Sequence, residues 1–532
     1  MKRKVRYSFL IILVVAGCMS TADDKWEITP DEKGIQAKKE ILQSLKQKSS
    51  SERPNIILIV ADDLGKYEVS GYGATHIQTP NIDAIGENGI RFKDTYVTAP
   101  ICAPSRAGIL TGKYQQRYGF ETQPMEFYPN KMQYSLGKKA KRLGDWTIST
   151  PPSYPHPEEI ERQGIPRDQI NLAEILKASG YSTGIIGKWH LGHGNEHIPN
   201  NRGFDYQYGF YGAFSIYTPE QKTPGYVNHI QDDMSAKHQW DMKRKRNAAI
   251  RENNEVVQED DYLTFAIRDK AKSFIADRKD SNFFLYLSFN APHVPFQAPQ
   301  NYYDQFSYIK DKNKRVYLAM IKALDDAIGD VMTELKAQGL EENTIVYFIS
   351  DNGGASYTGA TENGPFKGGK ITHFEGGVNV PFMMQWKGHL PENLVYNYPV
   401  SALDIFATTI AACKVDLTNV HESDGVNLLP FVSGDANNEP HEKIYWRTDH
   451  IRAIRYKKWK LIMSTRDNWL HLYNLENDLS EEIDLSELNS EEKAKLLQFF
   501  EEWNAELPQD FLWPRIMDRK FIIGDKTYYF PA

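Results

Sequence analysis

Three short, unbroken apolar segments constrain the fold of this chain more than any other feature of its sequence. They cover 55–61, 283–289 and 344–350, and a shorter segment of the same kind covers 182–186. A β-strand has this composition when both of its faces are buried. Between these segments lie stretches with helical periodicity or helix-capping residues, at 79–89, 171–180 and 317–339. Strands that alternate with helices predict an α/β fold, in which a large, mixed but mostly parallel sheet lies between helices.

Polar and ionisable residues follow directly after all four predicted strands. These residues are Asp62, Asp63, Lys188, His190, His293, Asp351 and Asn352. Ligands of parallel sheets bind beyond the carboxyl ends of the strands, so we expect these side chains to meet at one edge. Three carboxylates and one amide are hard oxygen donors, which suit Ca²⁺ and, less well, Mg²⁺. Taken alone, Asp62 and Asp63 would also be explained by a turn or a helix cap.

The N-terminus has the pattern of a targeting segment. Four basic residues precede an apolar stretch at 9–15 that is too short to span a bilayer. The following Ala16-Gly17-Cys18 resembles the end of a bacterial lipobox. We therefore expect residues 1–17 to be a lipoprotein signal peptide and Cys18 to carry lipid, which would anchor the protein in a bacterial cell envelope. A plain secretory signal with an incidental cysteine is the alternative.

Two further boundaries follow from changes in pattern. Residues 18–53 are polar and rich in Lys, Glu and Ser, which predicts a tether with a loose helix around 35–45. Residues 54–438 carry the α/β pattern. Residues 439–532 contain short strand-like segments and an amphipathic stretch at 490–504, which predict a smaller C-terminal subdomain with an antiparallel sheet and one helix.

Charge and cysteine content exclude some classes of protein. The net charge is −7 and no domain-wide basic excess is visible, so we expect no nucleic-acid partner. Apart from Cys18, the chain has only Cys102 and Cys413. A disulfide between them is formally possible, but a chain of this size does not need one. Cys413 ends an apolar helical stretch and is expected to be buried, which leaves Cys102 to be explained.

Cys102 lies in a specific motif. The segments 102–106 (Cys-Ala-Pro-Ser-Arg) and 110–112 (Leu-Thr-Gly) resemble the signature of the type I, formylglycine-dependent sulfatases. The resemblance covers about residues 54–470 and includes Asp62-Asp63, Gly187-Lys188-Trp189-His190, Ala291-Pro292-His293, Asp351-Asn352-Gly353, and Lys370 shortly before Glu375-Gly376-Gly377. It implies an alkaline-phosphatase-like fold and a sulfuric ester hydrolase activity. It also implies that a maturation enzyme converts Cys102 to formylglycine.

The same resemblance implies a role for each residue of the site. Ca²⁺ would be bound by Asp62, Asp63, Asp351, Asn352 and the modified Cys102. One hydroxyl of the hydrated formylglycine would attack sulfur and the second would later expel sulfate, which is covalent catalysis in two steps. Asp351 would activate the attacking hydroxyl, and His190 would deprotonate the second hydroxyl. His293 and Lys370 would bind sulfate and protonate the leaving group. Arg106 and Lys188 would orient formylglycine and sulfate.

The substrate is less constrained than the reaction. A basic and aromatic segment at 446–460 could read an anionic sugar chain, with His450 and Arg452 as candidate contacts, or could be a solvated strand face. Surface lipoproteins of this kind suggest a sulfated carbohydrate substrate, such as the algal polymer ulvan or a glycosaminoglycan. Two alternatives remain open, namely a phosphate mono- or diester hydrolase of the same superfamily and a non-catalytic glycan-binding protein on a sulfatase scaffold.

Overall fold

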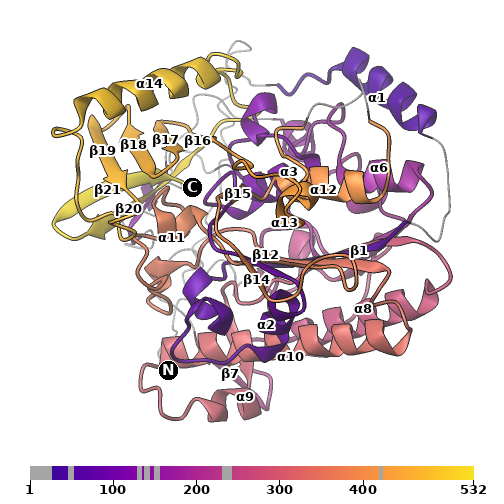
Figure 1. Ribbon diagram of the computed structural model, residues 1–532. Helices are drawn as coiled ribbons and strands as arrows, with labels where there is room; N and C mark the ends of the chain where they lie inside the picture. The colour runs from indigo at the N-terminus through magenta and orange to yellow at the C-terminus, as the bar shows by residue number, and fades with distance from the viewer. Residues whose placement is uncertain are drawn as a thin grey trace, which may run out of the picture.

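A computed structural model describes residues 27–45, 53–126, 128, 135–136, 144–148, 156–229, 242–417 and 423–532 (Figure 1). The predicted signal peptide and Cys18 lie outside the described residues. Within the described ranges, no helix combines the length and the apolar character needed to cross a bilayer.

The fold is organised around a ten-stranded sheet in which the predicted apolar segments are central. Its order is β14 (Leu394–Tyr396), β2 (Ile90–Phe92), β13 (Phe382–Gln385), β12 (Thr344–Ser350), β1 (Asn55–Ala61), β10 (Phe283–Ser288), β5 (Ser182–Lys188), β6 (Tyr206–Phe210), β8 (Arg251–Glu252) and β9 (Glu255–Val256). The five strands from β12 to β6 are parallel, whereas β13, β8 and β9 pair antiparallel to their neighbours. The predicted mixed, mostly parallel sheet is therefore confirmed.

Helices cover both faces of this sheet (Figure 1). Along β1, Ile57 and Ile59 pack in one core with α2 (Pro80–Glu87), α8 (Leu263–Asp277) and α10 (Lys312–Ala337). Ile56 and Leu58 point to the opposite face, toward α3 (Cys102–Thr111), α6 (Leu172–Ala178) and α12 (Asp404–Ala412). Because successive side chains of a strand alternate in direction, a strand covered on both faces must be apolar throughout, as β1 is.

Smaller elements complete this part of the chain. Two strand pairs, β7 (Tyr226–His229) with β11 (Phe296–Pro299) and β3 (Thr95–Tyr96) with β15 (Val400–Ser401), lie outside the large sheet. The short helices are α5 (Pro157–Glu161), α9 (Gln300–Gln305), α11 (Glu375–Val378) and α13 (Leu429–Val432).

The C-terminal region contains the predicted antiparallel sheet and helix. The sheet consists of β16 (Lys443–Thr448), β17 (Ile451–Tyr456), β18 (Trp459–Ser464) and β19 (Trp469–Asn474), and α14 (Ser490–Asn504) packs on it. A second, three-stranded sheet was not predicted. It joins β20 (Met517–Ile523) and β21 (Lys526–Pro531) to β4 (Trp146–Ile148) from the long insertion. The three residues of β4 are too few to show a periodicity of their own.

The predicted tether needs correction over part of its length. Helix α1 (Glu32–Ser44) is docked on the main domain, with Ile35 only 5% exposed. The Lys38 ammonium lies 2.6 Å from a carboxylate oxygen of Glu174 in α6, and Arg202 contacts the same oxygen at 3.1 Å. The polar composition of this segment predicts solvent exposure, but the segment contains a buried ion pair.

The C-terminal sheet shares one hydrophobic core with the main domain. Trp446 of β16 is fully buried, and its indole N–H donates a hydrogen bond to the carbonyl of Val97 at 2.7 Å. Its ring also packs edge-on against Tyr96, with centroids 5.4 Å apart. The sequence boundary predicted between 438 and 439 consequently does not separate two independent cores.

We expect Trp446→Ala to lower the free energy of unfolding by about 3–5 kcal/mol, because it removes a large buried side chain and a buried hydrogen bond. Urea denaturation followed by circular dichroism would measure the loss, and the shared core predicts one transition for both regions. Trp459→Ala, at a half-buried position of β18, is the control and should cost less. Two separate transitions in the wild-type protein would contradict the shared core.

Candidate active site

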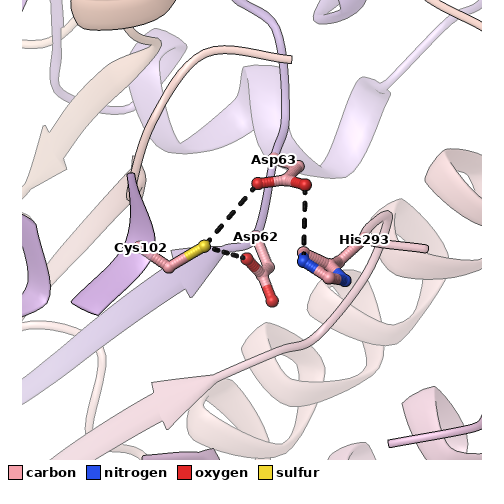
Figure 2. A group of neighbouring side chains, drawn as sticks. All are labelled: Asp62, Asp63, Cys102 and His293. Atoms are coloured by element: carbon pink, nitrogen blue, oxygen red, sulfur yellow. Dashed lines mark hydrogen bonds and ion pairs between the residues drawn. The ribbon is translucent and has the colours of Figure 1, made fainter. Parts of the chain in front are cut away.

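Cys102 occupies a buried position beside the ends of the central strands. It is the first residue of α3 and is 1% exposed. Its thiol donates to Asp62 Oδ1 at 3.3 Å and lies 3.8 Å from Asp63 Oδ1. Figure 2 shows the thiol pointing toward both carboxylates. Both aspartates follow directly after β1, and Asp63 adopts a left-handed backbone with φ +64°. This conformation, unusual for a residue with a side chain, lets two consecutive carboxylates face the same thiol.

Each aspartate has its own ammonium partner. Lys188 Nζ donates to Asp62 Oδ2 at 2.7 Å, and Lys370 Nζ donates to Asp63 Oδ2 at 2.9 Å. His293 Nε2 lies 3.6 Å from Asp63 Oδ2. Burial alone would raise the pKa of each carboxyl, but Lys188 beside Asp62 and Lys370 beside Asp63 bring both pKa values below their usual range. Both side chains are therefore carboxylates at neutral pH.

The third carboxylate, Asp351, follows β12 and is held by Arg106 of α3. Arg106 Nε donates to Asp351 Oδ2 at 2.8 Å, and neither side chain is exposed. The Asp63 amide donates to Asp351 Oδ1 at 3.2 Å, and Asn352 Nδ2 donates to Asp63 Oδ1 at 2.8 Å. Three buried carboxylates thus face three cations, and the formal charge of the set is zero.

The two histidines of the site differ in their partners. His190 has φ +59°, and neither of its buried ring nitrogens has a hydrogen-bond partner among the described residues. Burial, followed by the charges of Lys188 and Arg106, lowers the pKa of His190 well below its usual range. Burial and Lys370 also lower the pKa of His293. Two neutral imidazoles beside three ammonium and guanidinium groups are available as proton acceptors.

The arrangement suits a divalent cation. Ligand atoms of Asp62, Asp63, Cys102 and His293 all lie within 4.8 Å of one another. Asn352 Oδ1 is buried next to this group without a hydrogen-bond partner in the described part of the chain. A buried carbonyl oxygen without a donor is costly, and a cation would supply its missing partner. The carboxylate and amide oxygens match the preference of Ca²⁺ or Mg²⁺.

The two cysteines of the described chain are both free and buried, so no disulfide joins Cys102 to Cys413. Burial, together with the charge of Asp351, raises the pKa of the Cys102 thiol well above its usual range. Burial also raises the pKa of the Cys413 thiol to about 12. Since the thiolate is the nucleophilic form, an unmodified Cys102 is poorly suited to attack an ester.

Sequence reasoning missed Ser288, which ends β10. Its hydroxyl donates to the Lys188 carbonyl at 2.7 Å and accepts a hydrogen bond from Arg106 Nη1. Ser288 therefore orients the arginine that holds Asp351. A small polar residue at the end of an otherwise apolar strand was the available signal.

The proposed substrate contacts have mainly local partners. His450 is buried in the turn between β16 and β17 and bonds Ser464 Oγ through Nδ1 at 2.9 Å. Arg452 Nη1 donates to Thr465 Oγ1 at 3.0 Å. The prediction that the basic segment forms one sugar-reading or solvated face is wrong for three of its members. They pair with acids of the main domain. The pairs of Arg447 with Glu121 and of Lys460 with Glu375 are buried, and Arg455 pairs with the partly exposed Asp94.

We expect Arg106→Met to lower the free energy of unfolding by about 3–5 kcal/mol, because it leaves Asp351 as a buried carboxylate without its cation. Urea denaturation at neutral pH would measure this loss. Arg117→Met removes an arginine from a partly exposed pair with Asp424 and is the matched control, with an expected loss below about 1 kcal/mol. Equal losses in the two variants would contradict the structural importance of the buried pair.

Comparison with known proteins identifies the family. The sulfatase family profile matches residues 54–415. N-acetylgalactosamine-6-sulfatase of Rattus norvegicus is 30% identical over 421 residues, which cover 78% of this chain and 72% of that enzyme. The crystal structure of Ps i-CgsB in complex with k-i-k-neocarrahexaose is 33% identical, with a TM-score of 0.71, and the match covers 87% of this chain and 95% of that one.

A more distant likeness concerns the fold alone. The phosphonate monoester hydrolase of Agrobacterium radiobacter has a TM-score of 0.57 at 18% identity, over 85% of this chain and 95% of that one. The expected alkaline-phosphatase-like architecture is confirmed by these structural neighbours. The profile match, the relatives and the fold together show that this chain belongs to the sulfatase family and is a sulfuric ester hydrolase.

Proposed function

We propose that the enzyme hydrolyses sulfate monoesters on a sulfated polysaccharide or its oligosaccharides, with residue 102 as formylglycine and Ca²⁺ in the adjoining cluster. The observation that carries this proposal is the burial of Cys102 within 3.3 Å of Asp62, inside a set of three carboxylates and three cations. The carbohydrate class is supported by the likeness to Ps i-CgsB, which was solved with a bound neocarrahexaose. Ulvan and other algal glycans fall within this class.

Residues of this chain are suited to hold both groups. Oxygen atoms of Asp62, Asp63, Asp351 and Asn352 would hold the cation, which supplies electrostatic stabilisation to the charged sulfate oxygens when bound. Formylglycine at position 102 would supply two geminal hydroxyls as successive nucleophile and expelling group. Its place at the first residue of α3 adds the positive end of the helix dipole, which favours an anionic ester there.

The cationic side chains bind and orient the substrate. Although burial alone would lower it, the Asp63 carboxylate holds the pKa of Lys370 well above its usual range, so this ammonium stays charged and attracts a sulfate oxygen. Lys188 lies on the other aspartate, 2.7 Å from Asp62, and orients the same anion together with Arg106. Since the unliganded set is neutral, an anionic ester meets no net repulsion.

Proton transfers fall to the remaining groups. Asp351 would activate the first hydroxyl of formylglycine at position 102. Neither ring nitrogen of His190 has a hydrogen-bond partner among the described residues, and its pKa is lowered, so it is neutral and would accept the proton of the second hydroxyl. Lys370 and His293 flank Asp63. Lys370 keeps its proton and can donate it to the leaving oxygen, whereas His293 is neutral and would first have to take up a proton.

A phosphate ester hydrolase is the alternative within the same fold. Its metal face would resemble this one, and the phosphonate monoester hydrolase of Agrobacterium radiobacter shares the architecture. The sulfatase motif around Cys102 favours sulfate. A comparison of kcat/KM for matched aryl sulfate and aryl phosphate esters discriminates between the two.

The cell-envelope location remains a prediction from residues 1–18. We propose that Cys18 is lipidated and that the described domains are held at the membrane surface by this anchor. Labelling with a radioactive fatty acid that is lost in Cys18→Ser would support it.

We expect peptide mass spectrometry to find the aldehyde at residue 102 after co-expression with a formylglycine-generating enzyme. Cys102→Ala should abolish sulfate release from a panel of carrageenan, ulvan and glycosaminoglycan oligosaccharides while keeping the fold. Cys413→Ala changes the other buried free cysteine and is the matched control, which should retain turnover. Wild-type turnover in Cys102→Ala would show that the nucleophile is wrong.

We expect Ca²⁺ to raise the Tm of the chelator-treated enzyme, because a ligand of the native state stabilises it by about 2.7 kcal/mol at about 100 times Kd. Asp63→Asn should abolish this shift. Asp325→Asn alters a buried carboxylate that caps α2 outside the cluster, so it should keep the shift. Differential scanning fluorimetry with Ca²⁺ and Mg²⁺ measures the change in Tm. An unchanged Tm shift in Asp63→Asn would contradict the assignment of the cation site.

A further inference from the structure

The loop that carries Lys370 is held at both ends by one residue of the C-terminal subdomain. Lys367 Nζ donates to the backbone carbonyl of Glu481 at 2.8 Å. At the other end of the loop, the Glu375 amide donates to a carboxylate oxygen of Glu481 at 2.6 Å. Lys370 lies between Lys367 and Glu375, so Glu481, which is not part of the main sheet, binds both ends of the loop that carries Lys370.

A buried lysine joins the same two acids. Lys460 of β18 is fully buried, and its ammonium lies 2.8 Å from Glu375 and 3.0 Å from Glu481. Burial raises the pKa of Glu481 to about 7 even beside this ammonium. Without Lys460, two carboxylates would be buried side by side, which strongly disfavours their charged forms.

Glu481 also adopts a strained backbone, with φ +54°. A non-glycine residue in this region costs about 1–3 kcal/mol and persists only where its surroundings impose it. Here the conformation presents both the carbonyl and the carboxylate of one residue to the Lys370 loop.

Inside the loop, hydrogen bonds lie on both sides of Lys370, whose own amide donates to the Gly354 carbonyl at 3.0 Å. The Gly369 amide donates to Thr372 Oγ1 at 3.0 Å, and the Thr372 amide donates back to the Gly369 carbonyl at 2.9 Å. The amide of Ile371, the residue that follows Lys370, donates to the carbonyl of Pro100 at 2.7 Å. Pro100 lies two residues before Cys102. The segment is therefore hydrogen-bonded within itself, to Glu481 at its two ends and to Pro100 just before α3.

We propose that Lys460 and Glu481 are positioning residues, which set the place of the Lys370 ammonium beside residue 102 through the ends of its loop. This inference rests on the proposed function, in which Lys370 contacts the sulfate ester. It gives the C-terminal subdomain a part in the reaction without contact to the reacting atoms. A displacement of about 1 Å in such a group can cost about a hundredfold in rate.

A double-mutant cycle tests the coupling. Turnover of an activated aryl sulfate, whose leaving group needs little protonation, is measured in the wild type, Lys460→Met, Lys370→Ala and the double variant. We expect Lys460→Met to lower kcat/KM by at least about tenfold, but by less than about twofold when Lys370 is already alanine. Glu481→Gln keeps an acceptor for the Glu375 amide and weakens the ion pair, so its loss should be smaller and equally dependent on Lys370.

The control removes a lysine from another buried ion pair. Lys38→Met breaks the contact with Glu174 at the docking site of α1, so it should lower Tm and leave kcat/KM unchanged. If Lys460→Met behaves like Lys38→Met, or lowers kcat/KM equally in both backgrounds, the positioning inference is overturned. If Lys460→Met does not fold, the same comparison is made with Glu481→Gln. Wild-type kcat/KM in Lys370→Ala would instead overturn the proposed role of Lys370, and this inference with it.

Discussion

Three carboxylates buried at one sheet edge are the constraint on which the rest of this structure depends. Asp62, Asp63 and Asp351 have side chains that are at most 2% exposed, and each lies within 2.9 Å of a lysine or arginine nitrogen. A buried carboxylate without such a partner would protonate or destabilise the fold. The cations that bind an anionic ester are therefore also the groups that allow the acids to be buried, so the fold and the site share the same residues.

Strand order explains why these groups meet. Ala61 of β1 and Ser350 of β12 are register partners in neighbouring parallel strands, so the residues that follow them leave the sheet at the same height. The strands β10 and β5 lie on the other side of β1 and bring His293 and Lys188. The convergence of distant sequence segments is thus a consequence of parallel pairing, and this is why it could be inferred from apolar segments that end in polar residues.

Local sequence patterns predict some elements of this structure and not others. The central strands, the antiparallel C-terminal sheet and the residues near Cys102 follow from periodicity, turn signals and the sulfatase motif. The sheet that pairs β4 with β20 depends on a contact between residues 146–148 and 517–519, which no local pattern encodes. Helix α1 has a polar sequence that predicts exposure, although the Lys38 ammonium is buried against Glu174. Charge in a sequence indicates exposure only when no partner is available.

The basic segment of the C-terminal sheet also combines charge with burial. Arg447, Arg455 and Lys460 pair with acids from the main domain, and all three are buried. Buried ion pairs give little net stability compared with apolar packing, but they tolerate only one geometry. A hydrophobic interface around Trp446 already joins the two regions. The added ion pairs therefore fix the relative position of the C-terminal sheet and the Lys370 loop, to which Lys460 is tied through Glu375.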